Sequence, residues 1–107
     1  MTLRQITLFS FPEGASADYL ARMAAGLDEM ARVIPEILDA SWGPDVSGNP
    51  DNFGFALSLD FADRAALDRY KQHPAHQTFI RAYMREIPIT KVRTQYLVAT
   101  PTGAARP

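Results

Sequence analysis

The segment at residues 3–11 constrains the fold more than any other part of the chain. Phe9 and Phe11 occupy one set of alternating positions, and Ile6 and Leu8 occupy the other. Successive side chains of a β-strand point to opposite faces, so both faces of this strand are apolar. Such a strand is typical of a sheet that is covered on both sides. The rest of the chain must therefore supply or recruit two covering layers.

A helix is predicted after this strand. Ser16 stands in the N-cap position, Asp18 suits the positive end of the helix dipole, and Pro35 ends the helix. Apolar residues between them recur at three- and four-residue spacing, which is typical of an amphipathic helix of roughly five turns. They are Leu20, Met23, Ala24, Leu27, Met30, Ala31 and Ile34.

Three further segments are predicted to be strands, at residues 37–46, 53–61 and 90–99. In the middle one, large apolar residues alternate strictly with small or polar ones, which is typical of a half-buried strand. Residues 47–52 are rich in turn-forming types. This loop is interpreted either as a lid over a site or as a solvated turn.

A second helical region is predicted in two pieces. Asp63 caps the first piece, at residues 64–72, and Pro88 ends the second. Pro74 favours a restart, because proline suits the first helical position and pushes His73 out of the α region. One stripe of the restarted helix carries His76, Phe79, Ile80, Tyr83 and Ile87.

The order of the elements is therefore β-α-β-β-α-β, which predicts an α+β, ferredoxin-like fold. Helices in such a fold cover one face of the sheet, and a chain of 107 residues has no element left for the other face. A second copy of the chain would cover it, so a homodimer through the sheet face is expected. The residues expected on that face are Ile6, Leu8, Ala56, Ser58 and Leu97.

Composition limits the function. The formal net charge is −1 and there is no cysteine. The charge balance argues against nucleic acid or an anionic membrane as a partner. The lack of cysteine excludes disulfides, thiolate metal sites and a cysteine nucleophile. No signal peptide or membrane-spanning run is seen, so a cytoplasmic protein is expected, with one domain at 1–99 and a disordered tail at 100–107.

The motif Tyr-Lys-Gln-His-Pro-Ala-His-Gln-Thr-Phe at residues 70–79 connects the chain to a known family. It resembles the His-Pro-x-His signature of the stress-responsive A/B barrel domain (Dabb) family, within the dimeric α+β barrel superfamily. The stretches at 4–11, 34–37, 42–46 and 59–61 also agree with that family. The resemblance implies a dimeric α+β barrel, in which two sheets pack face to face with the helices outside.

The family is functionally mixed. Some members are stress-induced proteins without an established reaction. At least one, a plant enzyme, closes a linear polyketide by an intramolecular aldol step, with a tyrosine and the second histidine of the motif as the proposed catalytic pair. Those positions match Tyr70 and His76. Members often carry histidines where this chain has Gln5 and Phe55, so a more apolar pocket is expected here.

His76 and Tyr70 are the candidate catalytic residues. Proton abstraction beside a carbonyl needs a base that works near neutral pH and a donor for the developing enolate oxygen. An imidazole suits the first role and a phenol hydroxyl suits the second. Alternatively, His76 braces the restarted helix, and Tyr70 belongs to the core with its hydroxyl in water.

A small apolar pocket is expected between the sheet and the helices, with Gln5 as its polar handle. Plain core packing is the alternative for the same side chains. The candidate substrate-binding residues are Gln5, Thr7, Phe9, Met23, Leu27, Phe55, Leu57 and Phe79.

No cofactor is expected. His73 and His76 have the i,i+3 spacing of a metal-binding pair, but no third ligand has a recognisable spacing, and a helix-start role is favoured for His73. The sequence therefore predicts a cofactor-independent cyclase, lyase or isomerase for a carbonyl-bearing, polyketide-like or aromatic small molecule. The alternative is a non-catalytic stress-responsive or ligand-binding homodimer.

Overall fold

Four strands and the helices follow one another in the β-α-β-β-α-β order that the sequence predicts. The computed structural model describes residues 1–99, so the tail predicted at 100–107 lies outside the described residues. The elements are β1 (Leu3–Ser10), α1 (Ala17–Val33), β2 (Asp39–Pro44), β3 (Phe55–Phe61), α2 (Arg64–Gln72), α3 (Pro74–Phe79), the π-helix η1 (Ile80–Met84) and β4 (Thr90–Leu97).

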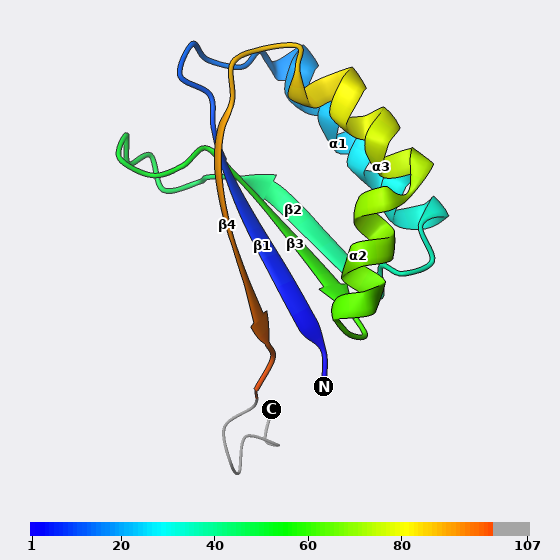
Figure 1. Cartoon of the computed structure of the whole chain (residues 1–107). Coiled ribbons are helices and arrows are strands. Elements are labelled where there is room, and N and C mark those ends of the chain that lie inside the picture. Colours follow the sequence, from blue (N-terminus) through cyan, green and yellow to red (C-terminus); the bar gives the residue numbers. More distant parts are fainter. Residues whose placement is uncertain (100–107) are drawn as a thin grey trace.

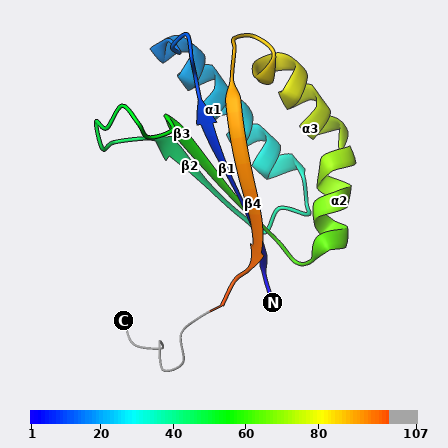
Figure 2. The same cartoon turned by 60° about the vertical axis from the view of Figure 1, so that its left-hand side comes forward.

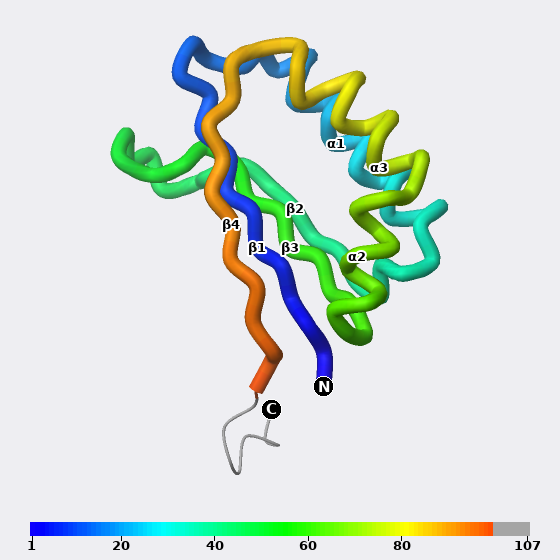
Figure 3. The backbone as a smooth tube through the Cα atoms, in the orientation of Figure 1, coloured from blue at the N-terminus to red at the C-terminus, as the bar shows by residue number. Residues whose placement is uncertain are grey.

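The strands form one antiparallel sheet in the order β2-β3-β1-β4. β1 therefore runs between β3 and β4, as the path of the chain shows (Figure 3). The helices all lie on one side of the sheet and leave its other side uncovered (Figure 1, Figure 2). This arrangement confirms the ferredoxin-like α+β fold expected from the order of the elements.

The register of β1 separates the two faces of the sheet. Its odd-numbered residues are buried, and its even-numbered residues remain partly exposed. Gln5 pairs with Leu59 on β3 and with Gln95 on β4, and Phe9 pairs with Phe55. Paired residues of an antiparallel sheet point to the same face, so these side chains lie under the helices.

The opposite face, here called the open face, carries apolar side chains that nothing in residues 1–99 covers. Val92 and Tyr96 are 48% and 43% exposed there. The register places on this face Arg4, Ile6, Leu8, Ser41, Ala56, Ser58, Asp60, Val92, Thr94 and Tyr96. The guanidinium of Arg4 donates two hydrogen bonds to Asp60, at 2.7 and 2.9 Å.

The placement of Leu97 on the open face was wrong. Leu97 pairs with Leu3, which is buried on the helix side of the sheet, so Leu97 belongs to that side. Both sets of alternating positions in β4 contain large side chains, and only the register with β1 determines which set faces the helices.

α1 packs its apolar stripe on the sheet. Its N-cap is as predicted, because Oγ of Ser16 accepts a hydrogen bond from the backbone N–H of Tyr19 at 3.0 Å. Sequence reasoning placed Leu20 on the stripe and missed Tyr19, which is 2% exposed. The residues that α1 buries are Tyr19, Met23, Leu27 and Met30.

The strands are shorter than predicted. β2 covers Asp39–Pro44 instead of 37–46, with one backbone hydrogen bond beyond each end, from Leu38 to Asp60 and from Asp45 to Gly54. β3 begins at Phe55 and β4 ends at Leu97, both inside the predicted bounds.

The break between α2 and α3 follows the prediction. A carboxylate oxygen of Asp63 caps α2 by accepting a hydrogen bond from the N–H of Ala66 at 2.9 Å. His73 then has extended backbone, with φ −67° and ψ 136°, and Pro74 begins α3. The chain changes direction at this point (Figure 3).

The restarted helix is shorter than predicted. It passes into the π turn η1 and ends at Met84, so Ile87 lies beyond it. A π turn widens the helix by one residue per hydrogen-bonded ring and shifts the stripe that a regular α-helix would present. No helix within residues 1–99 combines the length and the apolar character needed to cross a membrane.

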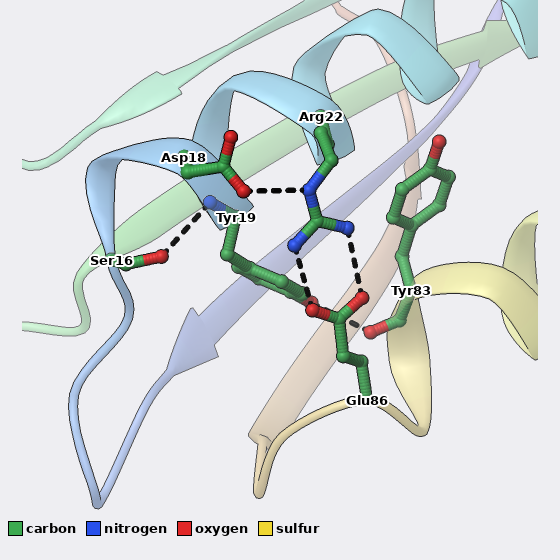
Figure 4. Close-up of polar contacts among 6 residues, drawn as sticks. All are labelled: Ser16, Asp18, Tyr19, Arg22, Tyr83 and Glu86. Atoms are coloured by element: carbon green, nitrogen blue, oxygen red, sulfur yellow. Dashed lines mark hydrogen bonds and ion pairs between the residues drawn. The ribbon is translucent and has the colours of Figure 1, made fainter.

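Side-chain contacts fasten the start of α1 to the end of the helical region (Figure 4). The hydroxyl of Tyr19 donates a hydrogen bond to the backbone carbonyl of Tyr83 at 2.6 Å. The guanidinium of Arg22 donates to both carboxylate oxygens of Glu86, at 2.9 and 2.7 Å, and to Asp18 at 2.9 Å. These contacts hold η1 against α1.

Replacing Tyr19 by phenylalanine is expected to lower the free energy of unfolding by about 1–2 kcal/mol, because the carbonyl of Tyr83 loses its partner in a partly buried position. Urea unfolding followed by circular dichroism measures this change. Arg22→Gln is the matched control. Its ion pair with Glu86 is solvent-exposed, so we expect a smaller loss that salt abolishes. An unchanged stability in Tyr19→Phe would contradict the role given to this contact.

Candidate functional site

A cavity of about 440 Å³, here called the pocket, lies between the sheet and the helices. The wall formed by the sheet includes Gln5, Thr7, Phe9, Leu57, Lys91 and Arg93. The wall formed by α2, α3 and η1 includes Tyr70, Lys71, His76, Phe79, Ile80 and Met84.

Most of the candidate site residues from the sequence line this one cavity. Gln5, Thr7, Phe9, Leu57 and Phe79 do so together with both members of the candidate catalytic pair. The other three candidates belong to the hydrophobic core and do not line the pocket. They are Met23, Leu27 and Phe55, which are 0%, 1% and 4% exposed.

The break at His73 brings Tyr70 and His76 together. Tyr70 lies in the last turn of α2, and His76 lies in the first turn of α3. Their ring centroids are 4.5 Å apart, at an interplanar angle of 51°. The Tyr70 ring also packs on Phe61, with centroids 5.0 Å apart, and this contact fixes its position from the sheet side.

A backbone contact sets the tautomer of His76. Its Nδ1 lies 3.1 Å from the carbonyl oxygen of Lys71. A carbonyl oxygen only accepts hydrogen bonds, so Nδ1 of the neutral ring carries the hydrogen and donates it. Nε2 is then left with a free lone pair. This arrangement leaves one ring nitrogen able to take up a proton.

Burial lowers the pKa of His76 below its ordinary value of 6.5. The positive charges of Lys91, Arg93 and Lys71 lower it further, while the contact with the Lys71 carbonyl acts in the opposite direction. The imidazole is therefore neutral at neutral pH, which is the form that a general base requires.

Burial raises the pKa of Tyr70 to about 12, and the nearby charge of Arg93 opposes this shift. Tyr70 therefore keeps its proton at any physiological pH. No protein group within residues 1–99 forms a hydrogen bond with the Tyr70 hydroxyl. Every fully buried polar side-chain atom in that range has a hydrogen-bond partner, so this hydroxyl is not fully buried. The hydroxyl is thus accessible from the pocket, where it can donate a hydrogen bond.

A chain of hydrogen bonds orients Gln5 at the floor of the pocket. A guanidinium nitrogen of Arg64 lies 3.4 Å from Oε1 of Gln95, and Nε2 of Gln95 donates to Oε1 of Gln5 at 2.8 Å. The oxygen of Gln5 is therefore occupied, and its NH₂ group is the part that remains available. Gln5 is 6% exposed, so this donor is well shielded from solvent.

Three cations in the pocket were missed by sequence reasoning. Lys71 comes from α2, and Lys91 and Arg93 come from β4. The only signal in the sequence was that Lys91, Arg93 and Gln95 share one face of the last strand. Charged residues on an edge strand are usually solvated, and the pairing with β1 is what turns these toward the pocket.

His73 has a structural contact of its own. Its Nδ1 accepts a hydrogen bond from the backbone N–H of Ala75 at 3.0 Å, so the ring caps α3. Within residues 1–99, no group of three or more histidine, cysteine or acidic side chains is arranged to hold a metal ion.

Comparison with known proteins connects this geometry to a family. The family model described as Stress responsive A/B Barrel Domain matches residues 3–92. An uncharacterised protein from Streptomyces coelicolor is 31% identical over 80 residues, which cover 70% of this chain and 79% of that protein.

Solved structures have the same fold. A dimeric ferredoxin-like protein of unknown function from Thermobifida fusca is similar with a TM-score of 0.81, at 23% identity and 92% coverage of both chains. The hydroxynitrile lyase from Passiflora edulis is similar with a TM-score of 0.74, at 17% identity, covering 94% of this chain and 97% of its own.

The stability of the protein is expected to fall as the pH drops below 6.5, because the folded state holds the pKa of His76 below that value. The unfolded chain then takes up a proton that the folded chain resists, so protonation favours unfolding. Urea midpoints at about pH 7.5 and about pH 5.5 measure the difference, above the range in which carboxylates titrate. His76→Gln should remove most of it. If the stability of the His76→Gln variant depends on pH as strongly as that of the wild type, another group is responsible for the effect.

Proposed function

The chain belongs to the stress-responsive A/B barrel domain family, and we propose that it is an acid–base enzyme acting on a carbonyl-bearing small molecule. The reaction would be a cyclisation, a lyase step or an isomerisation. One observation carries this proposal. A neutral histidine with a free Nε2 and a protonated tyrosine meet at 4.5 Å between ring centroids on the wall of one pocket.

In the proposed reaction, Nε2 of His76 removes a proton from the carbon beside a carbonyl. The C–H electron pair forms the C=C bond of an enolate, and the π electrons of the carbonyl move to its oxygen. The hydroxyl of Tyr70 donates a hydrogen bond to that oxygen. In a cyclisation, the enolate carbon attacks a second carbonyl of the same molecule, and His76 returns its proton to the new alkoxide.

The other two reactions use the same groups. An isomerisation returns the proton from His76 to a different carbon of the enolate. A lyase runs the carbon–carbon step in reverse, so that the base first removes a hydroxyl proton and the bond then breaks. One structural neighbour carries the name of a hydroxynitrile lyase. At 17% identity this is a likeness of fold, so the proposal rests on the pocket itself.

The cations compensate for a weak base. A histidine whose pKa is lowered is less basic, and this alone would slow the removal of a carbon-bound proton. Lys91 and Arg93 line the same pocket, and their charges favour the enolate over the neutral carbonyl compound. The same two charges therefore lower the pKa of the base and stabilise the product of the proton transfer.

A specific observation favours a second candidate, a non-catalytic ligand-binding dimer. The ring of His73 caps α3, and the ring of His76 bonds to the last turn of α2. Both histidines of the motif therefore support the break between the helices. In this candidate function, His76→Ala lowers stability by about 1 kcal/mol, the usual scale for a lost hydrogen bond, and changes no chemistry.

Exchange of α-hydrogens for deuterium in D₂O distinguishes the two functions without knowledge of the physiological reaction. We expect the protein to accelerate exchange in 4-phenylbutan-2-one, followed by NMR. His76→Ala and Tyr70→Phe should each slow this exchange by roughly 100-fold or more, the usual scale for losing a general base or an oxyanion donor.

His73→Asn is the matched control for this experiment. Asparagine preserves an N-cap, and His73 does not line the pocket, so exchange should continue at the wild-type rate. Circular dichroism shows whether each variant is folded. If folded wild-type protein does not accelerate exchange, or if His76→Ala exchanges as fast, the acid–base function is refuted and the binding function is favoured.

We also propose that the protein is a homodimer through the open face. Ile6, Leu8, Val92 and Tyr96 form an apolar surface there that residues 1–99 leave uncovered. The similar protein from Thermobifida fusca is described as dimeric. Two copies packed through this face would give β1 the second covering layer that its residues require.

Sedimentation equilibrium at micromolar concentration is expected to give about twice the chain mass of 11.9 kDa. Leu8→Glu should shift the protein to a monomer, because it puts a charge at the centre of the open face. Val33→Glu is the matched control, since Val33 is an exposed apolar residue on α1, away from this face. A monomeric wild-type protein, or a dimer that survives Leu8→Glu, would contradict the proposed interface.

A further inference from the structure

Several polar groups on the wall of the pocket are hydrogen-bond donors, in contrast to the free Nε2 of His76. They include the cations of Lys71, Lys91 and Arg93, the hydroxyl of Tyr70 and the NH₂ group of Gln5, all of which donate hydrogen bonds. No aspartate or glutamate is among the residues that line the pocket. The pocket is therefore positively charged although the chain as a whole has a formal net charge of −1.

Within residues 1–99 the pocket cations have no carboxylate partner, which they share with Arg64, Arg81 and Arg85. Arg4, Arg22, Arg32 and Arg69 each have a carboxylate partner. No ion pair within residues 1–99 involves Lys71, Lys91 or Arg93. No carboxylate within residues 1–99 neutralises the positive charge of the pocket, so this charge can attract an anionic ligand.

Lys91 and Arg93 act as a pair at the mouth of the pocket. They are two residues apart on β4, on its helix side, where they pair with Phe9 and Thr7 of β1. Partial burial and the charge of Arg93 lower the pKa of Lys91. Arg93 lines the same cavity as Tyr70 and His76, and its charge lowers the pKa of both groups.

We propose that the molecule bound in this pocket is an organic anion whose carboxylate is held by Arg93 and Lys91. This inference rests on the proposed function for the choice of pocket and names the chemical class of its substrate, a keto acid. A guanidinium presents a planar pair of donors that matches a carboxylate. The remaining walls, with Phe9, Leu57 and Phe79, suit an apolar body.

A carboxylate held on β4 would also direct the rest of the molecule. The pocket extends from β4 across β1 to α3, so a body attached to that carboxylate lies along the wall that carries His76 and Tyr70. The carboxylate would offset the charges that lower the pKa of His76, and the base would become stronger when the substrate is bound. The binding of the carboxylate would thereby favour removal of the proton from the reacting carbon.

The test compares 2-oxo-4-phenylbutanoate with its neutral methyl ester and with inorganic phosphate. Affinities are measured by calorimetry, and the ring signals of His76 are followed by NMR. We expect the acid to bind at least tenfold more tightly than the ester, and added salt to reduce this preference. The pKa of His76 should rise when the acid binds and should stay unchanged with the ester.

Two variants and a control assign the anion site. Arg93→Gln and Lys91→Gln should each weaken binding of the acid at least tenfold while leaving binding of the ester unchanged. Arg81→Gln removes a cation of η1 that does not line the pocket, so it should bind the acid like the wild type. Equal affinity for acid and ester, or an Arg93→Gln protein that binds the acid normally, would overturn the inference. If phosphate binds as tightly as the acid, the inference is also overturned, because the pocket would then bind anions without preference for a keto acid.

The inference and the proposed function can fail separately. If the acid binds through Arg93 but deuterium exchange is absent from both the acid and 4-phenylbutan-2-one, the anion site stands and the enzymatic function fails. If the ketone exchanges through His76 and the acid shows no preference, the function stands and the anion site fails. Binding of the acid to His76→Ala, which retains both cations, reports the anion site without any chemistry.

Discussion

The break in the helix at His73 and Pro74 is the constraint on which the site depends. In an uninterrupted helix, residues six apart point roughly 120° away from each other around the axis. The extended backbone of His73 resets this phase, and its ring caps the new helix. As a result, Tyr70 and His76 face the same cavity with their rings in contact. The same residues that interrupt the helix therefore create the only histidine–tyrosine contact among residues 1–99.

Most of the fold could be predicted from the sequence because its signals are local. Alternation identified the strands, and Ser16 and Asp63 are the N-caps that their positions indicated. The signals that failed depend on tertiary structure. The side of β4 on which Leu97 lies is set by its pairing with β1. The π turn after α3 is equally invisible to a pattern of period 3.6, and it ended the predicted apolar stripe early.

The candidate site was predictable where it is built from β1 and the His-Pro-x-His motif. It was not predictable for Met23 and Leu27, because their helical spacing fits both a pocket wall and the core. In the structure both side chains are buried in the core. Nor was it predictable for Lys91 and Arg93, whose residue types favour a solvated edge. The charges of Lys91 and Arg93 lower the pKa of His76 only because the sheet brings them to the same pocket. The chemistry of the pocket thus depends on long-range pairing more than on any motif.

β4 separates two surfaces by the alternation of its side chains. Val92 and Thr94 belong to the open face, whereas Lys91 and Arg93 belong to the pocket. Point substitutions can therefore alter either surface without touching the other, and each can diversify on its own. A single inserted or deleted residue within the strand would exchange the two sets of side chains. The charged side chains would then lie on the open face, and valine and tyrosine would lie in the pocket. Lineages that vary this pocket should accordingly differ in the identity of β4 residues while the length of the strand stays constant.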